Sequence, residues 1–189
     1  MNKKTVALTK EQYTEIIQTI QAGFLGHRPN PKIAAALVVE ANLGVRISDI
    51  VRLTLDSIIR DGERYRLDIT EQKTKKRRTF TVPAELYTYL QSYCIANKIG
   101  ADEVMFSISE RTVQHHLALV CDYLGEDYKN ISTHSFRKFF ATEIYNNNGK
   151  DITLVQRLLQ HSSTATTQRY IGVEPERIEQ ALRTHLTLI

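Results

Sequence analysis

The spacing of apolar residues changes twice along this chain of 189 residues, and the change limits the folds available to it. Up to about residue 55, apolar side chains recur every three or four positions, which is the period of a helix buried on one face. Three later stretches instead alternate or carry β-branched runs, at residues 57–60, 64–70 and 78–82. Asp61-Gly62 is a strong hairpin-turn signal, and Pro83 ends the strands. The pattern predicts a mainly helical α+β fold with one small three-stranded antiparallel sheet.

Capping residues mark where several helices should begin and end. Thr9 followed by Gln12 fits a capping box, Asn30-Pro31 marks a second start, and Gly44 is a suitable end for that second helix. Further helices are expected around residues 47–53, from Pro83 to about Asn97, and over 109–124, 133–147, 151–160 and 176–187. No linker or repeat divides the chain, so we expect one domain over residues 1–189, with a core of about 8–175.

Several classes of function are disfavoured by the composition. The chain has no run long enough to cross a bilayer and no signal peptide at its start, so a cytoplasmic location is expected. Cys94 and Cys121 are far apart and lack the spacing of metal ligands. Acidic residues are scattered and no Gly-rich phosphate loop is present, so neither a metal ion nor a cofactor is predicted.

Basic residues are concentrated in one predicted turn. The net charge is only +4, but five of the six residues from 73 to 78 are basic: Lys73, Lys75, Lys76, Arg77 and Arg78. Such a run is most often a solvated loop, and in other proteins it contacts phosphates. The run alone does not decide between these two interpretations.

Two motifs place a cation where a helix can present it. In STHSFRKFFATEIY, the helical period puts His134 and Arg137 side by side, roughly opposite the phenylalanines. In ANLGVRISDI, Arg46 follows Gly44 and Asp49 lies one turn later. Each motif taken alone is more typical of a solvent-facing pair than of an active site.

The third motif, LVQRLLQHSSTATTQRY, brings His161 to the end of one helix and Tyr170 to a Thr-rich segment of weak helix propensity. A tyrosine there is easy to move, which suits a nucleophile better than a core residue. A mobile tyrosine with arginines, histidines and lysines indicates phosphoryl transfer to the phenolic hydroxyl. Fixed guanidinium groups stabilise the negative charge that a phosphodiester gains in its transition state.

The order and spacing of these motifs resemble the catalytic domain of tyrosine recombinases, the phage integrase family. The matching elements, over about residues 8 to 175, are GVRISDI, EQKT, THSFRKFFAT, LLQH and TTQRY. The resemblance implies a site-specific DNA recombinase that cleaves and rejoins double-stranded DNA through a 3′-phosphotyrosyl intermediate. It assigns the nucleophile to Tyr170, the phosphate ligands to Arg46, Arg137 and His161, the general acid to Lys73, a proton-accepting or phosphate-binding role to His134, and support of the first arginine to Asp49.

Other assignments stay open at this stage. Lys75 and Lys76 lie within reach of the same turn as Lys73, so either is an alternative acid. Alternatively, they track the DNA backbone together with Arg77 and Arg78. Gln160 stands where the family usually has glycine, so a less tight helix end is expected there.

The resemblance also bears on assembly and on domain content. Family members usually carry a helical domain ahead of the catalytic one, and a first helix near residue 9 leaves no room for it. The chain is then expected to be either a naturally short recombinase or a catalytic fragment, and the former is favoured because the sequence opens with Met1. The resemblance implies a monomer in solution and a tetramer on DNA, with the helix of residues 176–189 packing either on its own domain or on a neighbouring subunit. The alternatives are an inactive DNA-binding regulator on the same fold, a type IB topoisomerase, and a helical interaction module with a buried Tyr170.

Overall fold

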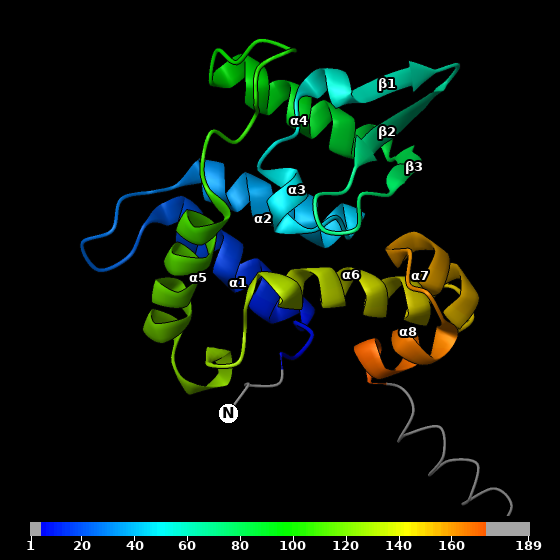
Figure 1. Ribbon diagram of the computed structural model, residues 1–189. Coiled ribbons are helices and arrows are strands. Elements are labelled where there is room, and N and C mark those ends of the chain that lie inside the picture. Colours follow the sequence, from blue (N-terminus) through cyan, green and yellow to red (C-terminus); the bar gives the residue numbers. More distant parts are fainter. Residues whose placement is uncertain (1–4, 173–189) are drawn as a thin grey trace, which may run out of the picture. The chain divides into compact units, whose positions relative to one another are not determined.

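The computed structural model of the protein describes residues 5–172 (Figure 1). The chain forms two compact units. The first unit extends to Phe140 and the second begins at Ala141. No linker marks the division, because it falls inside one helix. In order, the elements are α1 (Lys10–Ala22), α2 (Pro31–Leu43), α3 (Ile47–Ile50), β1 (Ile58–Asp61), β2 (Arg64–Thr70), β3 (Arg77–Val82), α4 (Ala84–Ala96), α5 (Glu110–Leu124), α6 (Thr133–Asn147), α7 (Ile152–Leu159) and α8 (Thr164–Ile171), with short 3-10 helices at Leu55–Ser57 and Glu126–Tyr128.

Helix starts follow the capping residues in the sequence. Thr9 and Gln12 form the capping box of α1, and the side chain of Asn30 accepts a hydrogen bond from the amide of Ile33 at the start of α2. The predicted helices of the first 172 residues are therefore confirmed to within a few residues. The helix expected at 176–187 lies outside the described residues. Among residues 5–172, no helix is long and apolar enough to span a membrane.

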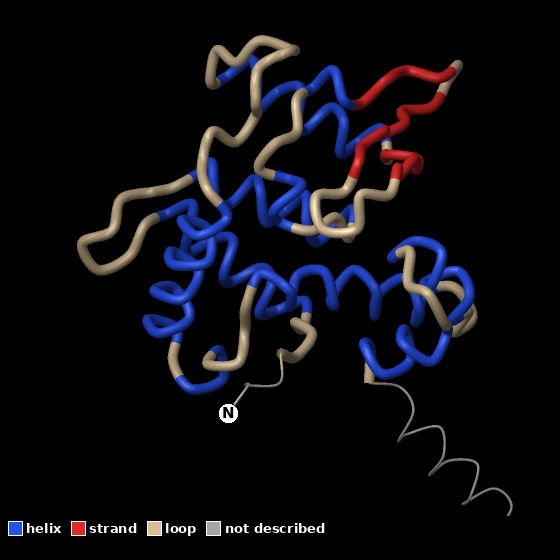
Figure 2. Tube along the Cα trace, in the orientation of Figure 1, coloured by secondary structure: helices blue, strands red, loops and turns tan. Residues whose placement is uncertain are grey.

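The predicted sheet is confirmed as an antiparallel sheet in the order β1-β2-β3. All of its strands come from one short stretch of the chain, drawn in red in Figure 2. Helix α4 packs beside β2, where the rings of Tyr65 and Tyr87 stack with centroids 3.9 Å apart. Leu67 in β2 and Leu90 in α4 are both fully buried. The connection between β2 and β3, residues 71–76, leaves the sheet and reaches α3.

The core of the first unit is one cluster of apolar side chains from the helices and the sheet. Its largest fully buried members include Ile16, Ile20, Ile33, Leu37, Ile50, Phe106, Leu117 and Phe136. The ring of Phe136, near the start of α6, meets Tyr13 of α1 edge to face, and Phe139 stacks on the same tyrosine. This packing fixes the face of α6 and therefore the direction in which its polar residues project.

Gly44 ends α2 in the left-handed conformation, with φ of 57° and ψ of 23°. A methyl group added at this position would overlap the ring of Phe140. The residue therefore has to be glycine both for its backbone angle and for the space that it leaves. The chain can then turn sharply and begin α3 at Ile47.

Gly44→Ala should lower the free energy of unfolding by about 2–4 kcal/mol, since it adds left-handed strain and a clash in the interior. Gly62, in the β1–β2 turn, is the matched control: its φ is 63° and nothing lies within 4 Å of an added Cβ. Gly62→Ala should cost about 1 kcal/mol. Urea denaturation of both variants measures the difference, and equal losses would contradict the role given to Phe140.

The second unit contains the end of α6 together with α7 and α8. Val155 and Leu159 are the buried residues of α7, and α7 packs on α8. Ser163 caps the start of α8, and its side chain accepts a hydrogen bond from the amide of Thr166. Gly172, in the left-handed conformation, ends it. Tyr170 thus lies in the last turn of a helix of only eight residues, as the sequence indicated.

Candidate active site

Arg46 occupies the N-cap position of α3, directly after the turn at Gly44. Its Nη1 lies 2.6 Å from Oε2 of Glu71, and the Glu71 side chain is completely buried. The Arg46 side chain is 19% exposed, so it is held by Glu71 without being fully enclosed. Arg46 is therefore fixed in direction by a charged hydrogen bond and still accessible to a ligand.

Arg137 projects from α6 and is buried, with only 3% of its surface exposed. Its guanidinium donates a hydrogen bond to the carbonyl oxygen of Gly44. Nη1 of Arg78, from β3, lies 3.4 Å from the same oxygen and 3.3 Å from Oε1 of Glu71. Three guanidinium groups thus gather around one turn and one carboxylate. Burial, and then the nearby charge of Arg137, lowers the pKa of Arg78 to about 10, so Arg78 stays charged at neutral pH.

The turn that carries Lys73 is attached to the same cluster at two points. The amide of Gln72 donates to Oδ1 of Asp49 at 2.8 Å, and the hydroxyl of Thr74 donates to Oε2 of Glu71 at 2.7 Å. Asp49, whose predicted role is to support Arg46, accepts this hydrogen bond from the turn. Glu71 is the carboxylate in direct contact with Arg46.

His134 lies in the first turn of α6, one turn before Arg137. The residue is exposed, yet burial of the ring lowers its pKa, and the positive charges of Arg137, Lys73 and Arg46 lower it further. Only Glu110 acts in the opposite direction. The imidazole is consequently neutral near pH 7 and able to accept a proton. The predicted site residues of the first unit therefore lie close enough together for their charges to act on His134; they are residues 46, 73, 134 and 137.

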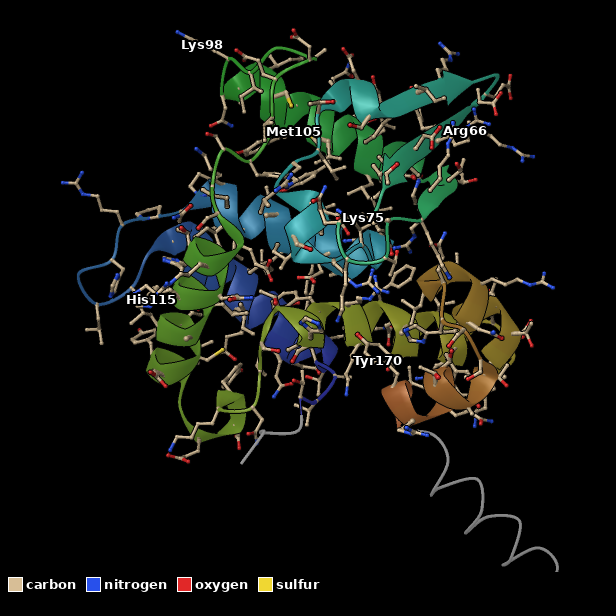
Figure 3. The ribbon with its side chains drawn as sticks, in the orientation of Figure 1. Arg66, Lys75, Lys98, Met105, His115 and Tyr170 are labelled. Atoms are coloured by element: carbon tan, nitrogen blue, oxygen red, sulfur yellow. The ribbon has the colours of Figure 1, made fainter. Side chains whose placement is uncertain are left out.

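The remaining basic residues of the turn fall into three kinds. Lys75, labelled in Figure 3, and Lys76 are exposed, and neither ammonium group has an ion-pair partner within residues 5–172. Arg77 is exposed but pairs with Asp68, its Nε lying 2.9 Å from Oδ1, and this pairing lowers the pKa of Asp68 to about 2. Arg78 is 2% exposed. Arg78, expected from the sequence to track the DNA backbone, has a side chain that points into the protein and contacts Glu71.

In the second unit, His161 and Tyr170 face each other. Their ring centroids are 5.2 Å apart and the rings meet edge to face. Nδ1 of His161 lies 3.1 Å from the hydroxyl oxygen of Thr167, and that hydroxyl donates to the carbonyl of Ser163. This contact with Thr167 of α8 holds the direction of the imidazole ring.

Gln160 ends α7 in the left-handed conformation, with φ of 55°. This explains why glycine suits the position, because it adopts such angles without strain. The helix end is nevertheless closed, since the amide of His161 donates to the carbonyl of Gln156 at 3.1 Å. The side chain of Gln156 returns a hydrogen bond to the carbonyl of His161 at 3.2 Å.

The first unit is suited to binding an anionic group and to proton transfer, since it contains fixed guanidiniums, a lysine on a tethered turn and a neutral histidine. The second unit contains a tyrosine beside a second histidine. Within residues 5–172, no group of three or more His, Cys, Asp or Glu side chains is placed to hold a metal ion. The sequence analysis did not single out Glu71, and it placed Arg78 among the DNA-tracking residues of the basic run. The sequence signal for Glu71 was an acidic residue two positions before the basic run.

The sequence profile of the Phage integrase family matches residues 7–177. The chain belongs to the phage integrase family. The predicted membership is confirmed, and the matched residues include the whole of both groups of site residues described above.

Sequence similarity to individual recombinases supports this family assignment. Tyrosine recombinase XerA of Pyrococcus furiosus is 27% identical over 184 residues, which are 93% of this chain and 60% of that protein. Tyrosine recombinase XerC of Caldanaerobacter subterraneus is 25% identical over 185 residues, 94% of this chain and 50% of that protein. Probable integrase/recombinase YoeC of Bacillus subtilis is 29% identical, over 75% of this chain and 78% of that protein. The chain thus spans only half to three fifths of the length of the two Xer relatives.

Solved structures establish the fold independently. The XerH site-specific recombinase bound to a palindromic difH substrate matches with a TM-score of 0.69 and 20% identity, over 95% of this chain and 53% of that one. The XerA recombinase matches with a TM-score of 0.64 and 22% identity, over 97% of this chain and 66% of that one. The predicted fold class, mainly helical with a small antiparallel sheet, is therefore confirmed for this member of the phage integrase family.

Proposed function

We propose that the protein is a site-specific DNA recombinase that cleaves and rejoins DNA strands through a 3′-phosphotyrosyl intermediate. The observation that carries the proposal is the fixation of Arg46 and Arg137, each by a charged hydrogen bond to the α2–α3 turn or to Glu71. Family membership and the similarity to a DNA-bound recombinase support it. The proposed partner is double-stranded DNA containing recombination sites.

In the proposed reaction, the phenolic oxygen of Tyr170 attacks the scissile phosphorus. The bond from phosphorus to the 5′ oxygen breaks, and a bond from phosphorus to the tyrosine oxygen forms. His134 accepts the tyrosine proton, and Lys73 gives a proton to the departing 5′ oxygen. Arg46, Arg137 and His161 bind the non-bridging oxygens, whose negative charge grows in the transition state.

The phosphotyrosyl bond conserves the energy of the phosphodiester, so neither ATP nor a metal ion enters the scheme. A 5′ hydroxyl from a second strand attacks the phosphorus in turn and releases the tyrosine. The same residues serve both directions, with Lys73 now accepting the proton that it gave. Strand exchange is then nearly isoenergetic, and the arrangement of sites decides the product.

A DNA duplex with a nick close to the cleavage point tests this function. The short fragment released by cleavage diffuses away, so a covalent protein–DNA adduct accumulates. The recombinase and a type IB topoisomerase both give an adduct, whereas an inactive regulator and an interaction module give none. Transfer of the attached strand to a second duplex then separates the recombinase from the topoisomerase.

Lys73→Ala should slow cleavage of ordinary DNA by about 10²–10⁴-fold, since it removes the general acid. A substrate with sulfur in place of the bridging 5′ oxygen should restore the rate, because a thiolate leaves without a proton. The measurement is the single-turnover cleavage rate on both substrates. Lys75→Ala is the matched control, and rescue of Lys75→Ala in place of Lys73→Ala would move the acid to Lys75.

Lys75 and Lys76 are proposed to contact the DNA backbone, since both ammonium groups are exposed on the tethered turn. We also propose that the protein is a monomer in solution and a tetramer on paired sites. Light scattering of the protein alone and bound to saturating site DNA tests the assembly. Monomeric complexes at saturation would contradict it.

A further inference from the structure

Glu71 directly follows β2, and its buried carboxylate contacts Arg46. Oε2 accepts hydrogen bonds from Nη1 of Arg46 at 2.6 Å and from the hydroxyl of Thr74 at 2.7 Å. Oε1 lies 3.3 Å from Nη1 of Arg78. One buried side chain thus contacts an arginine proposed to bind phosphate, a buried arginine, and the residue next to Lys73.

The backbone of Glu71 also closes the turn that carries Lys73. Its amide donates to the carbonyl of Lys76 at 3.0 Å, and its carbonyl accepts from the amide of Lys75 at 2.9 Å. Lys75 adopts a φ of 56° to complete the turn. The side-chain bond to Thr74 is therefore an internal brace across this turn, and any loosening of it acts directly on the neighbouring residue 73.

Charge balance gives Glu71 a second effect. Burial alone would raise the pKa of its carboxyl, but the hydrogen bonds from Thr74 and Arg46 and the charges of Arg46 and Arg78 lower it overall. The group is therefore ionised at neutral pH. Without this negative charge, Arg46, Arg78 and Arg137 would repel one another with no carboxylate of Glu71 between them. Arg46 is the least buried of the three and therefore the group best able to move away.

We propose that Glu71 is a positioning residue that couples the direction of Arg46 to the placement of Lys73, through its hydrogen bond to Arg46 on one side and its hydrogen bond to Thr74 on the other. The inference rests on the proposed function, because it assigns one residue to the set-up of both phosphate binding and leaving-group protonation. Glu71 does not touch the DNA. Its effect is exerted through the two residues that do.

Two pairs of variants test the coupling, with cleavage of ordinary and 5′-thio nicked DNA as the readout. Glu71→Gln removes the charge at constant shape, and Glu63→Gln is its control, since Glu63 is exposed in the β1–β2 turn. Thr74→Val removes only the hydroxyl, and Thr74→Ser retains it. Circular dichroism and the DNA affinity are measured for all four variants. The Thr74 pair keeps the test valid if Glu71→Gln does not fold.

Glu71→Gln should slow cleavage on the order of 10²-fold on ordinary DNA, since displaced catalytic groups cost about that much. The 5′-thio substrate should recover only part of this loss. Its leaving group needs no proton from Lys73, but its phosphate still has to be bound by Arg46. Thr74→Val should be slower than Thr74→Ser on ordinary DNA and should match it on 5′-thio DNA. A merely structural defect would not respond to the leaving group.

The outcomes separate the two proposals. If the wild-type chain forms no adduct, the proposed function fails, and the positioning role fails with it. If the wild type forms the adduct and Glu71→Gln cleaves as fast as Glu63→Gln, only the positioning role is overturned. Equal slowing of Thr74→Val on both substrates overturns the link to Lys73, since the sulfur leaving group then provides no rescue.

Discussion

Tyr170→Phe should abolish the covalent protein–DNA adduct while leaving DNA affinity nearly unchanged. The variant lacks the only atom that forms the new bond to phosphorus, so the effect is a complete loss rather than a slower rate. The ring itself remains, and with it the edge-to-face contact with His161 across 5.2 Å. The measurement is adduct yield on nicked DNA by denaturing gel, together with binding by a mobility-shift assay.

Tyr123→Phe provides the matched control for this loss. Tyr123 is exposed on α5, so removal of its hydroxyl changes the same chemical group away from the site. It should form the adduct at the wild-type rate. An adduct in Tyr170→Phe, or its absence in Tyr123→Phe, would contradict the assignment of the nucleophile.

Arg137→Ala should reduce the cleavage rate by about 10²–10³-fold or more, because it removes a fixed donor aimed at developing charge. Arg137→Lys should recover little of the loss. A lysine retains the charge but not the planar fork that serves Gly44 and a phosphate oxygen together. Single-turnover cleavage at saturating protein measures the chemical step apart from DNA binding.

Arg28→Ala is the control for the loss of one positive charge, since Arg28 is exposed in the α1–α2 connection. It should cleave DNA at the wild-type rate. The thermal midpoint of Arg137→Ala should also be compared with that of the wild type, because Arg137 is buried. Wild-type cleavage by Arg137→Ala would remove this residue from the site, whereas full rescue by Arg137→Lys would show that charge alone is needed.

Most of the fold follows from local signals in the sequence. Thr9, Asn30 and Ser163 cap helices through short-range hydrogen bonds, and Asp61-Gly62 lies at the turn of the β1–β2 hairpin, as predicted. Such features depend on residues within one turn of each other. The division into two units has no local signal, because its boundary lies within α6.

The site was harder to predict where it depends on contacts between distant residues. Glu71 is buried because Arg46 and Arg78 reach it from other elements, and no property of EQKT alone indicates this. Arg78 looked like one member of a basic run, yet it pairs with Ile69 in the sheet register while Arg77 pairs with Thr70. Since side chains alternate along a strand, the two arginines point to opposite faces. That alternation was the available signal.

The central claim is tested most directly by locating the DNA attachment on the protein. The wild-type chain is trapped on nicked DNA, digested with nuclease and protease, and the nucleotide-bearing peptide is sequenced by mass spectrometry. We predict a single 3′-nucleotide linked through phosphate to the oxygen of Tyr170. Attachment at any other residue, or no attached nucleotide under conditions of saturated binding, would contradict the account.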